Sequence, residues 1–328
     1  MKCKFLAIVI ALFLLVSCGN EPKPKKTEAS APSPAKYQQI SPSFNADSAY
    51  YFIEKQVSFG PRVCNSDAHT ACGNYLVAEF KKYADEVTEQ KAVVNNWDNK
   101  PLHIRNIVAS FNPTAKKRIL ICAHWDSRPY ADNDPNPANH TKAVDAADDG
   151  ASGVAVMLEM ARMMSKNKPS VGIDLICLDA EDLGKSDKGS DSYCLGSQYW
   201  GKKPHKLGYK ADYGILLDMV GAFNAKFVWE GFSMKYAEPV LRKVWDQAIQ
   251  LGFSNYFYYY QGGFITDDHK YINELAKIPT IDIIHYNEQT NSGFPAHWHT
   301  VNDNMNNIDR NTLKAVGQTI LEVVYKEH

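Results

Sequence analysis

Ile119-Leu-Ile-Cys-Ala-His124-Trp-Asp126-Ser is an apolar run that ends abruptly at an imidazole and a carboxylate. A continuous apolar run of this length is typical of a strand buried on both faces of a sheet. Further acidic or imidazole clusters follow downstream, several of them at the ends of later apolar runs: Asp148-Asp149, Asp179-Ala-Glu181-Asp182, Leu217-Asp218, Thr266-Asp267-Asp268-His269 and Trp298-His299-Thr300. Because open α/β sheets bind ligands beyond the carboxyl ends of their strands, the sequence predicts a metal site at this edge.

The remaining strands and helices are predicted from hydrophobic periodicity and from turn signals. Strands are predicted at 87–94, 102–111, 118–123, 173–178, 213–218 and 280–284. Helices are predicted from Asn45 or Asp47 to about residue 57, and at 67–83, 151–167, 236–251, 268–275 and 309–325. Three successive strands indicate that the sheet begins antiparallel, and the later alternation of strands with helices indicates parallel pairing. The predicted fold is α/β, with one domain whose central mixed, mostly parallel sheet has helices on both faces.

Length and charge exclude some classes of protein. The chain has 328 residues, of which 45% are hydrophobic and 22% charged, so it is long enough for one large domain with a full core. Its formal net charge is −1, and the body of the chain has no dense basic run. A nucleic acid is therefore not expected as a partner.

The N-terminal residues predict export. Met1-Lys-Cys-Lys precedes an apolar run from Phe5 to Val16, which is too short for a comfortable membrane span and is typical of a signal peptide, residues 1–17. Leu15-Val16-Ser17-Cys18 resembles a bacterial lipobox, which implies that Cys18 carries lipid; ordinary signal cleavage nearby is the alternative. Residues 18–36, rich in Pro, Lys, Ala and Ser, are predicted to form a flexible tether, and residues 37–328 the domain. The expected location is the periplasm, anchored by lipid to the envelope. By analogy with bacterial lipoproteins, Gly19 rather than Asp after the cysteine favours the outer over the inner membrane.

Cysteine usage is consistent with export but does not define a disulfide framework. Five of the seven cysteines lie beyond Cys18, and Cys64 with Cys72 is the nearest pair that could form a disulfide. Cys122 and Cys177 lie inside apolar strands and are expected to be buried thiols. No cysteine spacing is typical of a zinc finger.

Three of the clustered residues fit a catalytic zinc site, which takes three protein ligands and keeps one position open: Asp149, Asp182 and His299. Asp149 could instead cap the helix that follows it, and His299 could simply be a hydrogen-bonding residue in a loop. His297 is two residues away and equally able to bind zinc.

Glu181 is adjacent to a proposed ligand, so it can serve as a general base beside the metal without binding it. Asp218 and Asp267 could share a proton with Glu181 and raise its pKa. Alternatively, Asp218 could bind a second metal together with His124. Trp298 could form an apolar wall over a small substrate, completed by Tyr193 and the 294–299 loop.

Over residues 45 to 328 these motifs resemble the M28 metallopeptidase clan and, within it, the zinc-dependent glutaminyl cyclases. The motifs shared with the wider clan are His124-x-Asp126, Asp148-Asp149 before a Gly-Ala-Ser-Gly helix start, Glu181-Asp182, Asp218 and His299. The motifs that are more specific to the cyclases are Leu217-Asp218-Met-Val-Gly-Ala, Gly262-Gly-Phe-Ile-Thr-Asp267-Asp268-His269 and Trp298-His299-Thr300-Val-Asn-Asp303-Asn304. The resemblance implies the sheet architecture of the zinc aminopeptidases.

Carried over by position, the resemblance assigns a role to each group of residues. It implies zinc ligation by Asp149, Asp182 and His299, in preference to His297, and catalysis by Glu181, Asp218 and Asp267. The residues it implies for the substrate pocket are Trp298, Ile265, Thr266, Tyr193 and His124. Two positions depart from the pattern: Asp182 stands where the clan usually has Glu, and Tyr193 is the candidate replacement for a tryptophan that animal cyclases place after the acidic pair.

The activity implied by the resemblance is cyclisation of an N-terminal glutamine to pyroglutamate with release of ammonia, with one zinc ion per chain. The expected substrates are peptides and exported proteins that begin with Gln, and the expected state is a monomer. The alternatives are a di-zinc aminopeptidase, for which His124, Asp149, Asp182, Asp218 and His299 are all competent ligands, and a non-catalytic, lipid-anchored peptide-binding protein. An intact Glu181 argues against the last of these.

Overall fold

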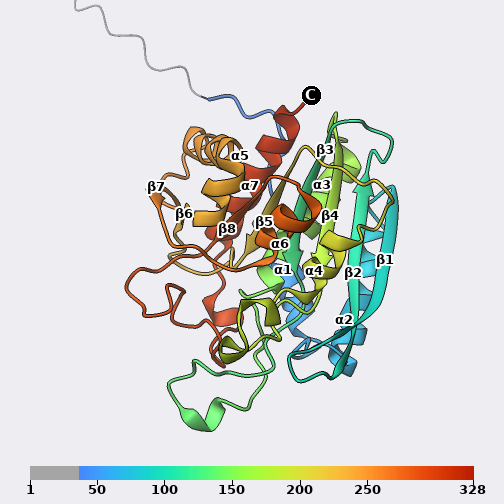
Figure 1. Cartoon of the computed structure of the whole chain (residues 1–328). Helices are drawn as coiled ribbons and strands as arrows, with labels where there is room; N and C mark the ends of the chain where they lie inside the picture. The colour runs from blue at the N-terminus through green and yellow to red at the C-terminus, as the bar shows by residue number, and fades with distance from the viewer. Residues whose placement is uncertain (1–36) are drawn as a thin grey trace, which may run out of the picture. The chain divides into compact units, whose positions relative to one another are not determined.

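The structure is a computed structural model that describes residues 37–328 (Figure 1). The predicted signal peptide 1–17 and the predicted tether 18–36, with the predicted lipidation of Cys18, lie outside the described residues. Within residues 37–328, no helix combines the length and the apolar character needed to cross a membrane.

A six-stranded sheet runs through the domain in the order β1-β2-β4-β3-β5-β8. Its strands are β1 (Glu86–Asn95), β2 (Pro101–Phe111), β3 (Arg118–His124), β4 (Gly172–Leu178), β5 (Tyr213–Asp218) and β8 (Thr280–Ile284). The pairs β1/β2 and β2/β4 are antiparallel, whereas β3/β4, β3/β5 and β5/β8 are parallel. The predicted mixed, mostly parallel sheet that begins antiparallel is confirmed, with β4 inserted between β2 and β3. A separate two-stranded sheet, β6 (Phe227–Trp229) with β7 (Phe257–Gln261), was not predicted, because such short strands leave little periodicity.

Helices cover both faces of the sheet, as predicted (Figure 1). One face packs against α1 (Ala46–Val57), α2 (Asp67–Phe80), α3 (Ala151–Lys166), α5 (Gly231–Gln250) and α7 (Arg310–Lys326). The other face packs against α4 (Leu195–Lys202), α6 (Asp268–Tyr271) and the π-helical turn η4 (Ile272–Ala276). Short 3-10 turns lie in the loops at η1 (Pro137–Asn139), η2 (Ser186–Lys188), η3 (Ser190–Ser192) and η5 (Met305–Asn307).

The central strand β3 shows why the sheet needs two covering layers. Ile119 and Ile121 point into the larger core, whereas Leu120 and Cys122 point into the smaller core on the opposite face. All seven residues of β3 are buried. Since successive side chains of a strand alternate between faces, a run that is apolar at every position is stable only when both faces are covered.

Two helical predictions differ from the structure, and one helix was not predicted. α5 begins at Gly231 rather than at residue 236, because the Glu230 side chain accepts hydrogen bonds from the backbone N–H groups of Phe232 and Ser233 and caps the helix. The helix predicted at 268–275 is divided into α6 and η4. Helix α4 was not predicted, since its eight residues include two glycines and carry little helical periodicity.

The five cysteines of the described residues are all buried, free thiols. The burial predicted for Cys122 and Cys177 is confirmed, and the possible disulfide between Cys64 and Cys72 is not formed.

The parallel strands β3, β4 and β5 end at the same edge of the sheet. His124 is the last residue of β3, Asp179 follows β4, and Asp218 is the last residue of β5. The fold therefore brings the clustered ionisable residues together, as the sequence predicted.

Candidate metal centre

Asp149, Asp182 and His299 converge beyond the carboxyl edge of the sheet. Each offers one ligand atom, and these atoms lie within 4.8 Å of one another. The Nε2 atom of His299 lies 3.1 Å from Oδ1 of Asp182 and 3.7 Å from Oδ2 of Asp149. All three residues are buried. Of the two histidines in the last loop, it is thus His299 that joins the aspartates.

A buried carboxylate fixes the loop that carries Asp149. The two carboxylate oxygens of Asp303 accept hydrogen bonds from the backbone N–H groups of Asp148, at 2.8 Å, and Asp149, at 3.0 Å. Gly150 follows with φ +100°, and a Cβ atom there would lie 2.7 Å from the carbonyl oxygen of Asp126, so the tight turn requires glycine. Helix α3 begins after Gly150 without a side-chain cap, so Asp149 is not the helix cap that the sequence also allowed.

The loop that carries Asp182 is fixed in the same way. Asp126 accepts hydrogen bonds from the backbone N–H groups of Glu181, at 3.0 Å, and Asp182, at 3.1 Å. Ala180 just before them has φ +55°, a left-handed conformation that tertiary contacts must stabilise. The guanidinium of Arg128 lies 3.2 Å from the carboxylate of Asp182 and bonds its carbonyl oxygen at 3.0 Å, which holds this short ligand in place.

His299 and His297 have different partners. Nδ1 of His299 lies 3.4 Å from a carboxylate oxygen of Asp132, which leaves Nε2 directed at the two aspartates. A carboxylate on the second ring nitrogen is the usual way to orient a histidine that binds a metal. His297 instead places Nε2 3.0 Å from the carboxylate of Asp148 and supports the loop.

These residues fit a zinc ion on the chemistry of their donors. Zinc binds both imidazole nitrogen and carboxylate oxygen, and a catalytic zinc site has three protein ligands. Oδ2 of Asp182 is buried without a hydrogen-bond partner, and such an atom is costly unless a ligand satisfies it. Burial and then the charge of Asp182 raise the pKa of Asp149, whereas a bound dication would stabilise both carboxylates.

A second group of possible ligands shares Asp149 with the first. His124, Asp149 and Asp218 are buried, with Nε2 of His124 lying 3.0 Å from Asp149 and 3.3 Å from Asp218. Burial raises the pKa of Asp218 to about 6. Burial opposes a charge on His124, but hydrogen bonds to Asp126, Asp149 and Asp218 outweigh this effect and raise its pKa. The arrangement suits either a hydrogen-bonded support or a second metal position.

Glu181 lies beside the first group and outside its ligand set. Its side chain is half-buried and converges with Asp267, their oxygens lying within 4.8 Å of each other. Burial, and then the charges of Asp182 and Asp267, raise the pKa of Glu181 well above its usual range. Burial and then Asp218 raise the pKa of Asp267 to about 7. Crowded carboxylates of this kind are able to exchange protons near neutral pH.

The residues expected to line a substrate pocket lie on two loops beside the cluster. The Trp298 ring stacks on that of His299, with centroids 3.7 Å apart, and contacts Phe294 at 4.5 Å. Ile265 and Thr266 are half-buried, and Glu230 holds the backbone of Ile265 through a 2.9 Å hydrogen bond. An aromatic wall therefore lies directly against one of the metal-binding candidates.

Tyr193 is placed differently from the other pocket candidates. Its ring packs against Gly184, where an added Cβ atom would come within 2.3 Å, and lies 5.6 Å from the guanidinium of Arg128. The structure thus places Tyr193 against the residue that holds Asp182.

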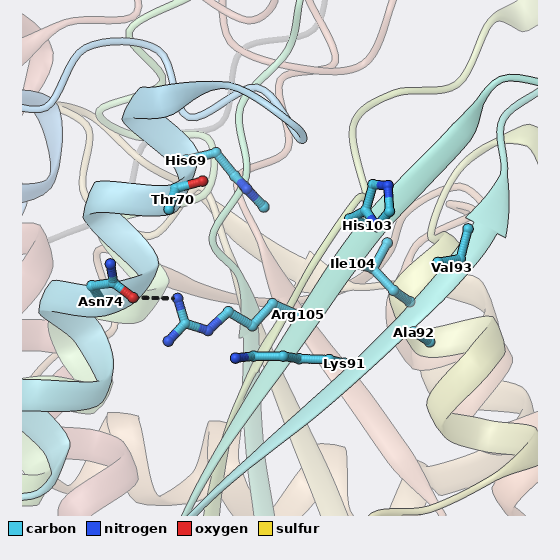
Figure 2. A pocket seen from close by; sticks show the side chains of 9 residues that line it. All are labelled: His69, Thr70, Asn74, Lys91, Ala92, Val93, His103, Ile104 and Arg105. Atoms are coloured by element: carbon cyan, nitrogen blue, oxygen red, sulfur yellow. Dashed lines mark hydrogen bonds between the residues drawn. The ribbon is translucent and has the colours of Figure 1, made fainter.

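A cavity of about 430 Å³ lies elsewhere, between α2 and the β1–β2 strands (Figure 2). In it, Arg105 reaches towards α2 and donates a 2.9 Å hydrogen bond to Asn74. Two residues of its wall also hold Asp179, through Nε2 of His69 at 2.9 Å and the backbone N–H of Arg105 at 2.6 Å. The cavity is separate from the carboxylate and histidine cluster, and its wall supports the loop that leads to Glu181.

Sequence reasoning missed most of this support. Asp132, Arg128 and Asp303 hold the three candidate ligands or their loops, yet none was assigned a role. The motif His124-x-Asp126 did indicate that Asp126 lies near the cluster, because residues two apart at the end of a strand point the same way. The others are joined to their partners only by the fold, so no local spacing could reveal them.

The chain belongs to peptidase family M28, whose sequence profile matches residues 106–324. Glutaminyl-peptide cyclotransferase from Bos taurus is 30% identical to it over 257 residues, which are 68% of this chain and 66% of that relative.

Solved structures extend the similarity to the whole described domain. Bacteroides thetaiotaomicron glutaminyl cyclase, bound to N-acetylhistamine, is 49% identical with a TM-score of 0.86, covering 88% of this chain and 100% of that one. A Zn-dependent exopeptidase from Parabacteroides distasonis is 51% identical with a TM-score of 0.86 and the same coverage. The fold is therefore shared with both a glutaminyl cyclase and a Zn-dependent exopeptidase.

Proposed function

We propose that this protein is a zinc-dependent glutaminyl-peptide cyclotransferase, which converts the N-terminal glutamine of peptides and proteins to pyroglutamate. The similarity to a glutaminyl cyclase at 49% identity over that enzyme's full solved chain carries the proposal. The convergence of Asp149, Asp182 and His299, with Glu181 next to them, supports it.

Asp149, Asp182 and His299 hold one zinc ion in this proposal. When bound, the zinc supplies Lewis acidity that polarises the side-chain carbonyl of the substrate glutamine. Asp132 and Arg128 keep His299 and Asp182 in their binding orientations.

Glu181 acts first as a base and then as an acid. Its carboxylate takes a proton from the α-amine as the amine nitrogen bonds to the side-chain carbonyl carbon. The bond from that carbon to the amide nitrogen then breaks, and Glu181 returns the proton to the leaving ammonia. The raised pKa of Glu181 suits this exchange.

The other residues bind and orient the substrate. Asp218 and Asp267 orient the amide nitrogen that leaves, while His124, Ile265 and Thr266 line the site. Trp298 presses the glutamine side chain towards its own amine. Because the reaction is intramolecular, holding this folded shape supplies much of the rate, and no protein nucleophile is needed.

A di-zinc aminopeptidase is the second candidate. The group formed by His124, Asp149 and Asp218 favours it, because Asp149 would bridge two metal positions. Metal analysis separates the two: about one zinc per chain supports the cyclase, and about two support the peptidase. A non-catalytic peptide-binding protein has no use for a base beside a ligand, so the position of Glu181 argues against it.

The direct test uses two peptides that differ only in their first residue, Gln or Leu, incubated with purified protein and followed by mass spectrometry. Loss of ammonia from the Gln peptide is the expected result. Release of free leucine from the other peptide, without any cyclisation, would overturn the proposal.

We also propose that the protein is exported and anchored to the envelope by lipid on Cys18. The anchor lies on the periplasmic side, in the outer rather than the inner membrane. There the protein acts as a monomer and modifies exported proteins that begin with Gln. The apolar run that ends in Leu15-Val16-Ser17-Cys18 supports the anchor. Metabolic labelling with a radioactive fatty acid should mark the wild type and not Cys18→Ala. Equal labelling of both would refute the anchor.

A further inference from the structure

Cys194 adopts a backbone conformation that a cysteine rarely takes. It precedes helix α4 with φ +57° and ψ 35°, in the left-handed region. Glycine or asparagine adopts this region at lower cost than other residues. A non-glycine residue stays in this region only when the surrounding contacts stabilise it.

The Cys194 side chain is directed at the proposed general base. Its Sγ atom donates a hydrogen bond to Oε1 of Glu181 at 3.2 Å, and its backbone N–H bonds the Glu181 carbonyl at 2.9 Å. Next to it, the N–H of Leu195 bonds the carbonyl of Ala180 at 3.0 Å. The start of α4 therefore clamps the catalytic loop through both backbone and side chain.

This thiol is the sole protein donor to the Glu181 carboxylate among residues 37–328. Oε2 consequently has no protein donor and remains available to a substrate. A glutamate side chain has three rotatable bonds, so an unheld carboxylate would spend part of its time out of reach of the amine.

The thiol keeps its proton and so remains a donor. Cys194 is fully buried, and burial followed by the charge of Glu181 raises the pKa of its thiol well above the ordinary value. A buried, protonated thiol is a poor nucleophile and a poor metal ligand. Positioning is the role that remains.

We infer that Cys194 is a positioning residue for Glu181: its thiol holds Oε1 so that Oε2 faces the substrate amine. This inference rests on the proposed cyclase function. It requires that loss of the donor slows the chemical step and leaves substrate and zinc binding in place.

The test compares Cys194→Ala with Cys194→Ser, in which a hydroxyl restores a donor. Cys177→Ala is the matched control, because that thiol is equally buried and, within residues 37–328, no hydrogen bond joins it to Glu181. For Cys194→Ala we expect kcat to fall about tenfold, with KM and zinc content within about twofold of the wild type. Cys194→Ser should recover most of the rate, and the control should keep it.

Two outcomes overturn the inference: a kcat for Cys194→Ala within about twofold of the wild type, or a serine variant as slow as the alanine variant. If Cys194→Ala does not fold, Cys194→Gly replaces it, because glycine relieves the left-handed backbone while lacking the donor. A stable glycine variant with a low kcat supports the role, and one with full activity refutes it. Failure of the wild type itself to cyclise Gln peptides would instead refute the proposed function.

Discussion

Replacing Glu181 with glutamine removes the charge and the basicity of this side chain while keeping its size. The amide oxygen of glutamine can still accept the hydrogen bond from Cys194, which lies 3.2 Å from Oε1. Glu181 is not part of the group formed by Asp149, Asp182 and His299. The substitution should therefore leave the fold and zinc binding intact and remove only the proton transfer.

The expected loss of rate follows from that single deficit. A positioned general base contributes about 10²- to 10⁴-fold to a rate, so kcat should fall by about 10³-fold, or about 4 kcal/mol of transition-state stabilisation. KM should change little, because the substrate contacts remain.

The assay measures ammonia release from a Gln-initiated peptide in parallel with zinc content by elemental analysis. A matched control is Glu238→Gln in α5, because the Glu238 side chain is 44% exposed and pairs with Arg242. An unaltered rate in Glu181→Gln with full zinc occupancy would refute the assignment of the base. A variant that loses its zinc would show that Glu181 is a ligand.

Three further predictions concern the ligands, the wall and the acid stability of the domain. Asp132→Asn should weaken zinc binding about 10- to 100-fold, measured by chelator competition, because Nδ1 of His299 loses its carboxylate; unchanged affinity would show that this 3.4 Å contact does not orient the ligand. Trp298→Ala should lower kcat/KM at least about tenfold with zinc retained, since the substrate loses its aromatic wall; an equal kcat/KM would remove Trp298 from the pocket. Burial opposes the charge of Glu230, but His269 and backbone N–H groups outweigh it and lower its pKa to about 2. The lowered pKa of Glu230 therefore contributes about 3 kcal/mol to the free energy of unfolding. This contribution is fully present above the unfolded pKa of about 4.5 and is lost as the pH falls through about 2. Denaturant unfolding of Glu230→Gln should show a smaller loss of stability between pH 5 and pH 3 than the wild type. An equal loss in the two proteins would contradict the stabilising role assigned to the Glu230 carboxylate.

The sequence predicted the residues whose position follows from local periodicity. His124 and Asp218 end apolar strands, and parallel strands bring their carboxyl ends to one edge, so their convergence required only the pattern of strands and helices. The choice of His299 over His297 depended on family resemblance. In the structure, the reason is physical: Asp148 engages His297, while Asp132 turns Nε2 of His299 towards the aspartates.

The supporting contacts could not be predicted, because they join residues far apart in the chain. Asp303 lies 155 positions from Asp148, and Arg128 lies 54 positions from Asp182. Nothing in either local sequence marks such a pair, since a buried aspartate and an exposed one look the same in a sequence.

The short ligand Asp182 shows how these contacts bear on function. An aspartate reaches one methylene less than the glutamate usual at this position, so its loop must bring the backbone closer to the metal or hold the side chain more rigidly. The structure provides the rigidity: Asp126 fixes the backbone N–H of Asp182, and Arg128 fixes its carbonyl and one carboxylate oxygen. The other oxygen remains buried and unpaired, which is costly in the absence of a cation. The same rigid loop carries Glu181, so the contacts that compensate for a short ligand also keep the proposed base at a fixed position beside it.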